Sequence, residues 1–494
     1  MSLSGQPEVF FSTAATSRAV ARLVAAGRVR PIDGRMYTKN LDDPIDEVLR
    51  RRVWDVAAGY FPGAVVADRT AFEMRPSGEE GSVFLAADTA RVVRLPGLVL
   101  NVRRGPGPVA GDTAYINGLY LSSWPRRFLE NLRPSRSRSG VRRTLTRDEI
   151  EDQLRTALAR RGSDELNRLR DEASEIADDL GAELQLRELQ QLVGALLGTV
   201  DAPLSSPGAR AVASGRGWDD ARLARFDALL GELHVQLPAL RSEPTGYRGS
   251  TFAFHEAYFS NFIEGTEFTL EEAGEIIFAG RIPQDRPADA HDVMGTFDLV
   301  GDASRRAQVP ASAQELHAIV KSFHATILAG RPDLRPGEYK RRANRAGMTE
   351  FVAPSLVEGT LDQGWTRYAT LPPGMARALF ALFLISEVHP FADGNGRVAR
   401  ALANAELSAA GEQRVIIPTV LRDDYLQALR ALSRDAHGAA LIRVVDRAQQ
   451  WSHEVDWSSV SAARVDLDRT NALLPSAEAE ALGVILRLPS EAGA

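Results

Sequence analysis

A short segment late in the chain, residues 389–400, brings several chemically useful side chains close together. His389 is a titratable base, and Asp393 offers a hard carboxylate oxygen of the kind that Mg²⁺ prefers. Arg397 and Arg400 are three residues apart, so on a helix they share a face and can both reach a polyphosphate. The residue types therefore indicate chemistry on phosphate groups.

The loop within this segment, residues 393–396, reads Asp-Gly-Asn-Gly and precedes a helical pattern. A helix N-terminus presents unpaired backbone N–H groups and the positive end of the helix dipole, so it attracts anions, and glycines let the backbone approach closely. Taken singly, each residue has an ordinary interpretation as a capping histidine, a turn or a solvated arginine. A turn alone leaves their combination unexplained, so we expect a phosphate-handling site.

Two helices are expected to position this loop. Residues 375–388 are apolar almost all round, which predicts a helix buried in a core, and Pro390 prevents its continuation. Downstream, apolar residues recur at helical spacing from about Asn395, and Gly411 is placed as a C-terminal stop. The segment is therefore predicted to form a helix-loop-helix.

The run HPFADGNGRVAR resembles the motif of the Fic family, and the similarity extends over about residues 218–451. It implies an all-α fold with a small β-hairpin flap, and an enzyme that transfers AMP from ATP to a Tyr, Thr or Ser hydroxyl of a target protein, with Mg²⁺. The implied roles are a base (His389), a core anchor (Phe391), a metal ligand (Asp393), a phosphate loop (Gly394, Asn395, Gly396) and outer-phosphate ligands (Arg397, Arg400). Some Fic relatives transfer UMP, phosphocholine or a γ-phosphate; the intact GNGR here resembles the AMP-transferring branch.

An upstream segment, SNFIEG, suggests a built-in inhibitor. Ser260 and Glu264 are four residues apart, one turn on the same helix face, and Gly265 marks the place where that helix ends or bends. This resembles the inhibitory motif of the Fic branch in which the inhibitory helix precedes the catalytic core. The resemblance implies that Glu264 pairs with Arg400 and holds the enzyme off. The alternative is a surface helix that carries an ordinary acid.

A second upstream segment is expected to bind the target. Gly347, Thr349, Glu350 and Phe351 lie in a hairpin-like setting between two helical tracts, which resembles the flap of the family. Such a flap would hold the target as an added strand through backbone hydrogen bonds. An ordinary surface hairpin is the alternative interpretation.

The N-terminal region has a different texture. A helical period places Val20, Leu23 and Val24 on one face, Gly27 follows as a stop, and Asp33-Gly34 separates two short extended runs as in a tight hairpin. Short β-rich runs such as SVFLAA, ARVVRL and GLVLNV then predict a mixed α/β domain, and a capping box of Thr146 with Glu149 opens a helical tract. Helix followed by hairpin suggests a wing.

This half resembles the antitoxin-like AbiEi proteins over about residues 12–180, through segments such as STAATSRAVARLVAAGRVRPIDGRMY and LSSWPRRFLENL. The resemblance implies a winged helix-turn-helix that contacts double-stranded DNA or docks a protein. Scattered arginines are more often a solvated face, which is the alternative for Arg18, Arg22, Arg28, Arg30 and Arg35. An interaction protein therefore stands beside the enzyme: a DNA-binding regulator or antitoxin whose Fic domain senses a nucleotide or transfers another phosphate-containing group.

Length and composition agree with a multidomain protein. The 494 residues exceed one compact core, and we expect a winged helix (1–42), an α/β domain with a helical tail (43–204), a linker (205–217), the Fic domain (218–455) and a C-terminal extension (456–494). The absence of cysteine suits a cytoplasmic protein, and neither a signal peptide nor a membrane partner is indicated. The formal charge of -6 favours no class of partner. Modification of the protein by itself and a homodimer are further interactions that the sequence allows.

Overall fold

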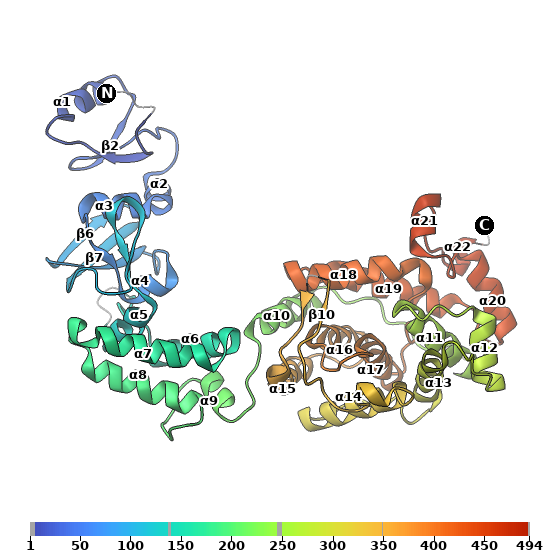
Figure 1. The fold of residues 1–494 in the computed structure, drawn as a ribbon. Helices are drawn as coiled ribbons and strands as arrows, with labels where there is room; N and C mark the ends of the chain where they lie inside the picture. Colours follow the sequence, from blue (N-terminus) through green and yellow to red (C-terminus); the bar gives the residue numbers. More distant parts are fainter. Residues whose placement is uncertain (1–4, 137–139, 245–248, 348, 493–494) are drawn as a thin grey trace. The chain divides into compact units, whose positions relative to one another are not determined.

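A computed structural model describes residues 5–136, 140–244, 249–347 and 349–492. The chain forms two compact units, Met1–Ser214 and Gly215–Ala494 (Figure 1). The segment 205–217, expected to be a linker, instead contains helix α9 (Pro207–Ala213), which belongs to the first unit. Ser206 caps this helix, Pro207 occupies its first turn and Ala209 is fully buried, so a composition typical of linkers here forms a packed helix.

The first unit begins with one helix and a three-stranded antiparallel sheet in the order β1-β3-β2. The elements are β1 (Val9–Phe11), α1 (Ser17–Ala25), β2 (Arg30–Asp33) and β3 (Met36–Thr38). The predicted helix and hairpin are present, and Gly27 and Gly34 take positive φ at their ends. Within residues 5–43, however, α1 is the single helix, so the expected helix-turn-helix pair is not formed there.

The expected boundary at residue 42 does not separate two cores. Val9 and Met36 pack into the same buried cluster as the helices and strands that follow. That cluster lies between helices and a six-stranded mixed sheet in the order β6-β7-β5-β4-β9-β8. The strands are β4 (Val65–Val66), β5 (Ser82–Ala87), β6 (Arg91–Leu95), β7 (Leu98–Arg104), β8 (Thr113–Ala114) and β9 (Tyr120–Leu121). The three β-rich runs of the sequence are thus confirmed as strands β5, β6 and β7.

Helices complete the first unit. They are α2 (Ile45–Arg51), α3 (Val53–Tyr60), α4 (Asp68–Glu73), α5 (Trp124–Asn131), α6 (Arg147–Arg161), α7 (Ser163–Leu180), α8 (Glu183–Leu196) and α9. The predicted capping box is present at the start of α6, where Thr146 and Glu149 each bond the other's backbone N–H. Helices α5 to α9 share a separate apolar cluster, so a helical part follows the α/β part of this unit.

In its described residues, the second unit is helical apart from one short hairpin. Its elements are α10 (Asp220–Val235), α11 (Gly249–Ile263), α12 (Leu270–Ala279), α13 (Pro287–Gly301), α14 (Ala313–Ile327), β10 (Arg345–Ala346), β11 (Thr349–Glu350), α15 (Val357–Tyr368), α16 (Met375–Val388), α17 (Asn395–Ala409), α18 (Arg422–Asp435), α19 (Ala439–Glu454), α20 (Val460–Arg469), α21 (Ser476–Leu482) and α22 (Pro489–Ala492). This confirms the all-helical fold predicted for this half.

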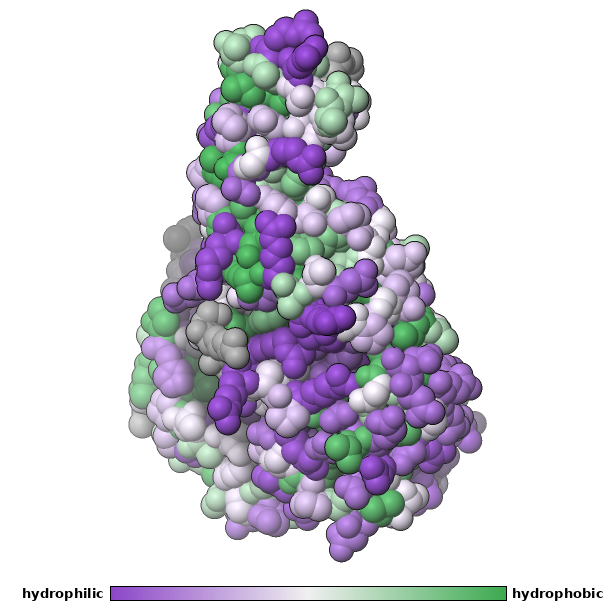
Figure 2. Space-filling view, turned by 90° about the vertical axis from the view of Figure 1, so that its left-hand side faces the viewer, coloured by the Kyte–Doolittle hydropathy of each residue, from purple (hydrophilic) through white to green (hydrophobic). Residues whose placement is uncertain are grey.

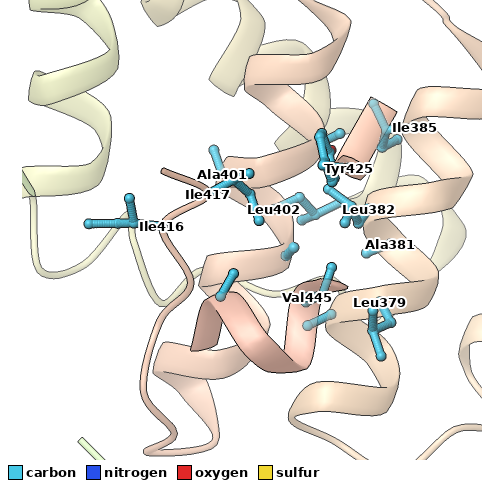
Figure 3. Packing of buried hydrophobic residues seen from close by; sticks show 14 of the residues in the cluster. Leu379, Ala381, Leu382, Ile385, Ala401, Leu402, Ile416, Ile417, Tyr425 and Val445 are labelled. Atoms are coloured by element: carbon cyan, nitrogen blue, oxygen red, sulfur yellow. The ribbon is translucent and has the colours of Figure 1, made fainter. Parts of the chain in front are cut away.

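Helices α16 and α17 form the centre of the second unit (Figure 1). They pack on each other, with α10, α15 and α18 against α16 and with α11, α13 and α14 against α17. Figure 3 shows Leu382 of α16, Leu402 of α17, Tyr425 of α18 and Val445 of α19 converging in this core. Burial of α16 on every side explains its apolar sequence, and it fixes the loop that joins α16 to α17.

The C-terminal segment 456–494 is not a separate extension. Trp457, Ala463 and Leu467 are buried in the main core of the second unit, and Asp456 N donates to Asp466 Oδ2 at 2.8 Å.

The face drawn in Figure 2 is mostly hydrophilic, with apolar residues in small separate groups. Among the described residues, we find no helix with the length and apolar character needed to cross a membrane.

Candidate active site

The loop between α16 and α17 has an unusual backbone. Helix α16 ends at Val388; His389 caps it in the left-handed conformation with φ 52° and ψ 59°, and Pro390 follows. Helix α17 begins at Asn395 after Gly394, whose φ is 74°. A left-handed histidine costs energy that the surroundings must compensate, and such residues cluster at functional sites. The predicted helix-loop-helix is therefore confirmed, with His389 at its turning point.

The side chain of Asn395 holds the loop rather than a ligand. It is buried, its Oδ1 accepts from Phe391 N at 2.8 Å, and its Nδ2 donates to Phe391 O at 3.0 Å. The N–H groups of the first turn, from Asn395 onward, have no acceptor within the helix. These backbone groups, rather than the amide of Asn395, are available to an anion.

Phe391 is buried, as expected for a core anchor, and its partner is a residue that the sequence did not suggest. The ring of His324 stacks on it with centroids 3.9 Å apart and planes 4° from parallel. Gly337 N donates to His324 Nδ1 at 2.8 Å, so Nε2 carries the proton toward Asp393 O at 3.2 Å. Burial lowers the pKa of His324 to about 4, so it packs as a neutral ring.

His389 is held on two sides. Its Nδ1 lies 3.2 Å from Ser386 O, and its ring stacks on Phe351 with centroids 3.7 Å apart and planes 7° from parallel. A carbonyl can only accept, so we assign the proton to Nδ1, which leaves the lone pair of Nε2 free. Burial lowers the pKa of His389 to about 4, so the imidazole is neutral at pH 7. A neutral imidazole with a free Nε2 can accept a proton.

Arg400 is tied to the segment that the sequence singled out as inhibitory. Its Nη2 lies 2.8 Å from Glu264 Oε1 and 2.7 Å from Ser260 O, and its Nε donates to Ser260 Oγ at 3.0 Å. Ser260 lies on α11, and Gly265, just beyond that helix, has φ 92°. The structure therefore brings together the two distant segments that the sequence had paired.

The Glu264 carboxylate also lies over the start of α17. A Cβ built on Gly396 would come within 2.1 Å of Glu264 Oε1 and 3.0 Å of Arg400 Nη1, so any larger side chain there would have to displace the Glu264 carboxylate. The carboxylate thus lies next to Gly396, in the first turn of α17, as well as beside the guanidinium. Both features attract anions, and a carboxylate is already beside them.

Arg397 does not share the setting of Arg400. Its Nη1 lies 2.6 Å from Asp292 Oδ2 and 3.2 Å from Asn261 Oδ1, and the side chain is 3% exposed. Asp292 also accepts from Arg331 Nε at 2.9 Å. Arg397 and Arg400 are three residues apart on α17, and this spacing predicted that they share a face. Neighbouring helices nevertheless give them different partners. Asp292, Asn261 and Arg331 lie far from the motif in sequence, and no local pattern marked them.

A cavity of about 240 Å³ opens beside these groups. The residues that line it include Glu264, Thr349, Phe351, His389, Gly396 and Arg400. One wall is apolar, since Leu426 and Leu429 of α18 contribute to it. A cavity with apolar walls and a few convergent polar groups is the usual form of a small-molecule site.

The segment expected to be a flap forms a short antiparallel hairpin. Arg345 pairs with Glu350 and Ala346 with Thr349, and Gly347 takes φ 58° at the turn; Met348 lies outside the described residues. Phe351 lies just beyond the second strand. The hairpin borders the cavity through Ala346 and Thr349, whereas its binding of a target stays a prediction.

Asp393 lies at the edge of the site. Its side chain is 50% exposed, its Oδ1 accepts from Gly394 N at 2.7 Å, and its Oδ2 lies 3.6 Å from Arg397 Nη2. Among the described residues, no three histidine, aspartate or glutamate side chains gather in a way that would hold a metal ion. A single carboxylate fits Mg²⁺ only when substrate phosphates complete the coordination, because Mg²⁺ is often bound by one or two carboxylates plus phosphate and water.

Comparisons with known proteins agree with this geometry. Residues 314–407 match the sequence profile of the Fic/DOC family. Protein adenylyltransferase Fic of Drosophila willistoni is 28% identical over 225 residues, and that of Drosophila melanogaster is 28% identical over 226 residues. Each match covers 43% of this chain and 43% of the relative, so the chain spans less than half the length of these curated relatives.

Among solved structures, a Fic domain-containing signalling protein from Bacteroides thetaiotaomicron is 17% identical, with a TM-score of 0.36, over 49% of this chain and 97% of that one. Fic-1 from C. elegans is 18% identical, with a TM-score of 0.35, over 61% of this chain and 93% of that one. The likeness to Fic proteins is therefore one of sequence, given by the family profile and by the curated relatives. Within the second unit, residues 314–407 therefore match the Fic/DOC family in sequence.

Proposed function

We propose that this protein transfers AMP from ATP to a hydroxyl group of a protein, and that Glu264 holds the reaction off. The observation that carries the proposal is the position of the Glu264 carboxylate, 2.8 Å from Arg400 and directly over Gly396. There it is beside the two features that attract phosphate, the guanidinium and the start of α17. The relatives named protein adenylyltransferase support the same reaction.

The proposed reaction needs a base, an anion site and a leaving group. The target hydroxyl oxygen attacks the α-phosphorus of ATP, and its proton passes to Nε2 of His389. The bond from the α-phosphorus to the bridging oxygen breaks, and the electron pair leaves with pyrophosphate. The N–H groups at the start of α17 and the Arg400 guanidinium stabilise the phosphate charge, so catalysis rests on positioning and electrostatics.

Asp393 is the residue that would hold Mg²⁺. Its half-exposed carboxylate lies at the loop, next to the proposed phosphate site. The metal, bound together with the substrate phosphates, would neutralise charge on the leaving pyrophosphate. Asp393 itself has a second task in this chain, because its Oδ1 accepts from Gly394 N and helps to fix the loop.

Inhibition follows from competition for one guanidinium. Arg400 has its Nη2 committed to Glu264 and to Ser260 O, and its Nε to Ser260 Oγ. A γ-phosphate that needed the same guanidinium would have to displace the carboxylate. Because charge-assisted pairs of this kind are strong, ATP would bind in a pose that does not align the α-phosphorus.

The hairpin β10–β11 is the proposed docking place of the target. It borders the cavity that contains His389 and consists of two short strands. An extended target segment could add to an exposed strand edge through backbone hydrogen bonds, which carry little sequence information. This arrangement would bring a hydroxyl of the segment to Nε2 of His389.

The experiment compares Glu264→Gly with the unchanged protein. The purified chain is incubated with Mg²⁺ and ATP labelled at the α-phosphate, and label on protein is measured, including self-modification. We expect at least about tenfold more label for Glu264→Gly, since one lost charge-assisted bond is worth about 1.4 kcal/mol or more. The matched control is Glu275→Gly, which makes the same substitution at a glutamate outside the cavity.

Glu275 lies on α12, where it pairs with the exposed Arg281. Its replacement removes one carboxylate from the same region without reaching the cavity. Equal labelling by all three proteins, with each folded, would contradict the inhibition. Label from the γ-phosphate or from UTP, and none from the α-phosphate of ATP, would assign a different transferred group.

A second function is supported by the surface of the first unit. Arg18 and Arg22 on α1, Arg28 after it and Arg35 in the hairpin are exposed. Two of the acids at this end of the unit, Glu8 and Asp43, pair instead with Arg51 and Arg52, and Asp33 accepts from the Tyr60 hydroxyl. The four guanidinium groups are therefore free of ion pairs among the described residues. We propose that they bind a polyanion, double-stranded DNA being the candidate.

This proposal is tested by filter binding of the full chain to duplex DNA at about 50 and 200 mM salt. Affinity should fall steeply as salt rises, because each neutralised phosphate releases counterions. The double variant Arg22→Ala/Arg35→Ala should bind more weakly and show a shallower salt slope. The control Arg160→Ala/Arg187→Ala removes two exposed arginines from α6 and α8 and should change little. If both double variants lose the same DNA affinity, the overall charge of the protein, rather than this surface, accounts for the binding.

A further inference from the structure

Lys340 contacts the backbone on both sides of the turn at His389. Its own N–H donates to Pro390 O at 2.9 Å, and its Nζ lies 3.5 Å from Val388 O. The Val388 carbonyl directly precedes His389, and the Pro390 carbonyl lies one residue beyond it, where the chain leaves α16. One residue from a distant segment therefore contacts the chain before and after the left-handed turn.

Asn344, four residues further on, extends these contacts. Its Oδ1 accepts from Lys340 Nζ at 2.7 Å, and its Nδ2 donates to Phe391 O at 2.9 Å. Its backbone carbonyl accepts from Phe351 N at 3.2 Å. Phe351 is the ring that stacks on the imidazole, so the two residues reach His389 both through its backbone and through its ring.

The setting of Lys340 is costly for a cation. The side chain is 6% exposed, and the oxygens that accept from Nζ, those of Asn344 and Val388, are uncharged. No carboxylate pairs with it among the described residues. Burial lowers the pKa of Lys340 to about 7, with the charge of Arg222 adding to the effect. An apolar residue of the same length would avoid this cost. What favours the cation here is its two carbonyl acceptors and the ring of Phe351, whose centroid lies 5.9 Å from Nζ, and all of these contacts lie around His389.

We propose that Lys340 and Asn344 are positioning residues that hold His389 in its left-handed conformation with the imidazole directed toward the cavity. A left-handed conformation is unfavourable for histidine and persists only where neighbours over-determine it. Lys340 fixes the flanking peptides, and Asn344 orders both the loop and the ring that covers the imidazole. The residues act through His389, and neither touches the reacting atoms.

The inference rests on the proposed AMP transfer, so the test starts from the Glu264→Gly background, where activity is measurable. Lys340→Met keeps the length of the side chain and its backbone bond but removes the ammonium. We expect kcat to fall about 10- to 100-fold while KM for ATP stays within about twofold, since a misplacement of about 1 Å can cost 10²-fold. The melting temperature should stay the same or rise, because a buried charge is removed.

Arg341→Met is the matched control. Arg341 is the next residue, it is exposed, and its partner is Glu338. Its replacement should leave kcat unchanged. Asn344→Ala should lower kcat as Lys340→Met does, and the double variant should lose little more than either single variant, because the two residues act as one unit. Lys340→Arg, which can still donate to both oxygens, should recover part of the lost kcat.

A second readout does not depend on any transfer activity. Histidine labelled with ¹³C at Cε1 gives one NMR signal for each histidine, and His389→Ala identifies the signal of His389. In Lys340→Met this signal should shift or broaden, and in Arg341→Met it should not. An unchanged signal and an unchanged kcat would overturn the proposal. If no variant transfers AMP, the reaction is wrong, and the NMR signal still decides the role of Lys340.

Discussion

Two clusters of arginine and carboxylate groups, one in each unit, have the same chemistry and opposite settings. In the first unit, Arg126 lies 2.5 Å from Asp112 and 2.9 Å from Glu130, and Arg103 bridges Glu130 to Asp68 at 2.7 and 2.8 Å. The side chains of Arg126, Asp112 and Asp68 are 0% exposed. Every carboxylate of this cluster has an arginine beside it.

In the second unit, Arg400 has the same kind of partner, but Glu264 is 28% exposed and borders a cavity. In the proposed inhibition, the carboxylate leaves without emptying a packed core, and a phosphate group takes its place beside Arg400. The closed cluster offers no such exchange, since removal of either sign would leave the other buried and unpaired. Similar ion pairs are therefore enclosed in one place and border a cavity in the other, and the proposed exchange of Glu264 for a phosphate depends on that cavity.

The largest expected effect concerns the cavity of the second unit, which His389 and Glu264 line. His389→Ala in the Glu264→Gly background should lower AMP transfer about 10²- to 10⁴-fold, the usual contribution of a general base. ATP binding, followed by calorimetry, should change little, because the imidazole acts on the hydroxyl rather than on the nucleotide. A variant that remains folded and transfers AMP at the rate of its parent would show that another group is the base.

Substitutions in the buried cluster around Arg126 should change the stability of the first unit and leave AMP transfer unchanged. Arg126→Met leaves Asp112 and Glu130 without this partner and should destabilise the first unit by about 3–5 kcal/mol, as expected when one member of a buried ion network is lost. Pulse proteolysis in urea can follow fragments of each unit. Arg127→Met, which loses one bond to Ser122 O, is the matched control and should cost far less. A loss of AMP transfer that precedes unfolding of the first unit would break the contrast.

A smaller effect on AMP transfer should distinguish the charge of the Glu264 side chain from its volume. Glu264→Gln keeps the size of the side chain beside Gly396 but replaces a charge-assisted bond with a neutral one, which is roughly half as strong. AMP transfer should therefore rise a few-fold, less than in Glu264→Gly. Self-labelling rates of the two variants under the same conditions check this order. The reverse order would indicate that the space, rather than the charge, matters.

The smallest expected effect is that of pH. Burial lowers the pKa of His389 to about 4, and protonation would remove the base. The neutral form therefore persists as pH falls through about 6.5, where an exposed histidine would already be half protonated. In the Glu264→Gly variant, kcat/KM should change less than about threefold between pH 8 and 6 and fall only toward pH 5 and below. A half-maximal value near pH 6.5 would show that the imidazole is solvated in the active form.

Much of the second unit could be predicted from the sequence. The buried helix before His389, the turn at Pro390 and the helix from Asn395 follow from apolar periodicity and from glycine and proline, which act locally. The contact of Glu264 with Arg400 was predicted through a family resemblance and agrees with the distance found. Domain boundaries differ from those predicted: residues 205–217 contain a helix, and residues between 457 and 488 belong to the core, because packing rather than composition decides both.

The residues that position the site could not be predicted in this way. Asp292 pairs with Arg397 across 105 positions, and His324 stacks on Phe391 from the distant helix α14. Lys340 sits in a segment whose sequence, GEYKRRANR, contains several basic residues that look alike. Local patterns cannot distinguish them, since burial and partners are properties of the packed chain.

The sequence by itself determined which groups were available: a base, an anion loop with glycines, two arginines and a carboxylate at a fixed spacing. The tertiary structure decided how each is used. It directed Arg397 into a buried network and Arg400 toward Glu264, although both lie on one helix, because α11 and α13 present different partners at the two positions. Side-chain type is a local property, whereas exposure and charge pairing arise only when distant segments pack together.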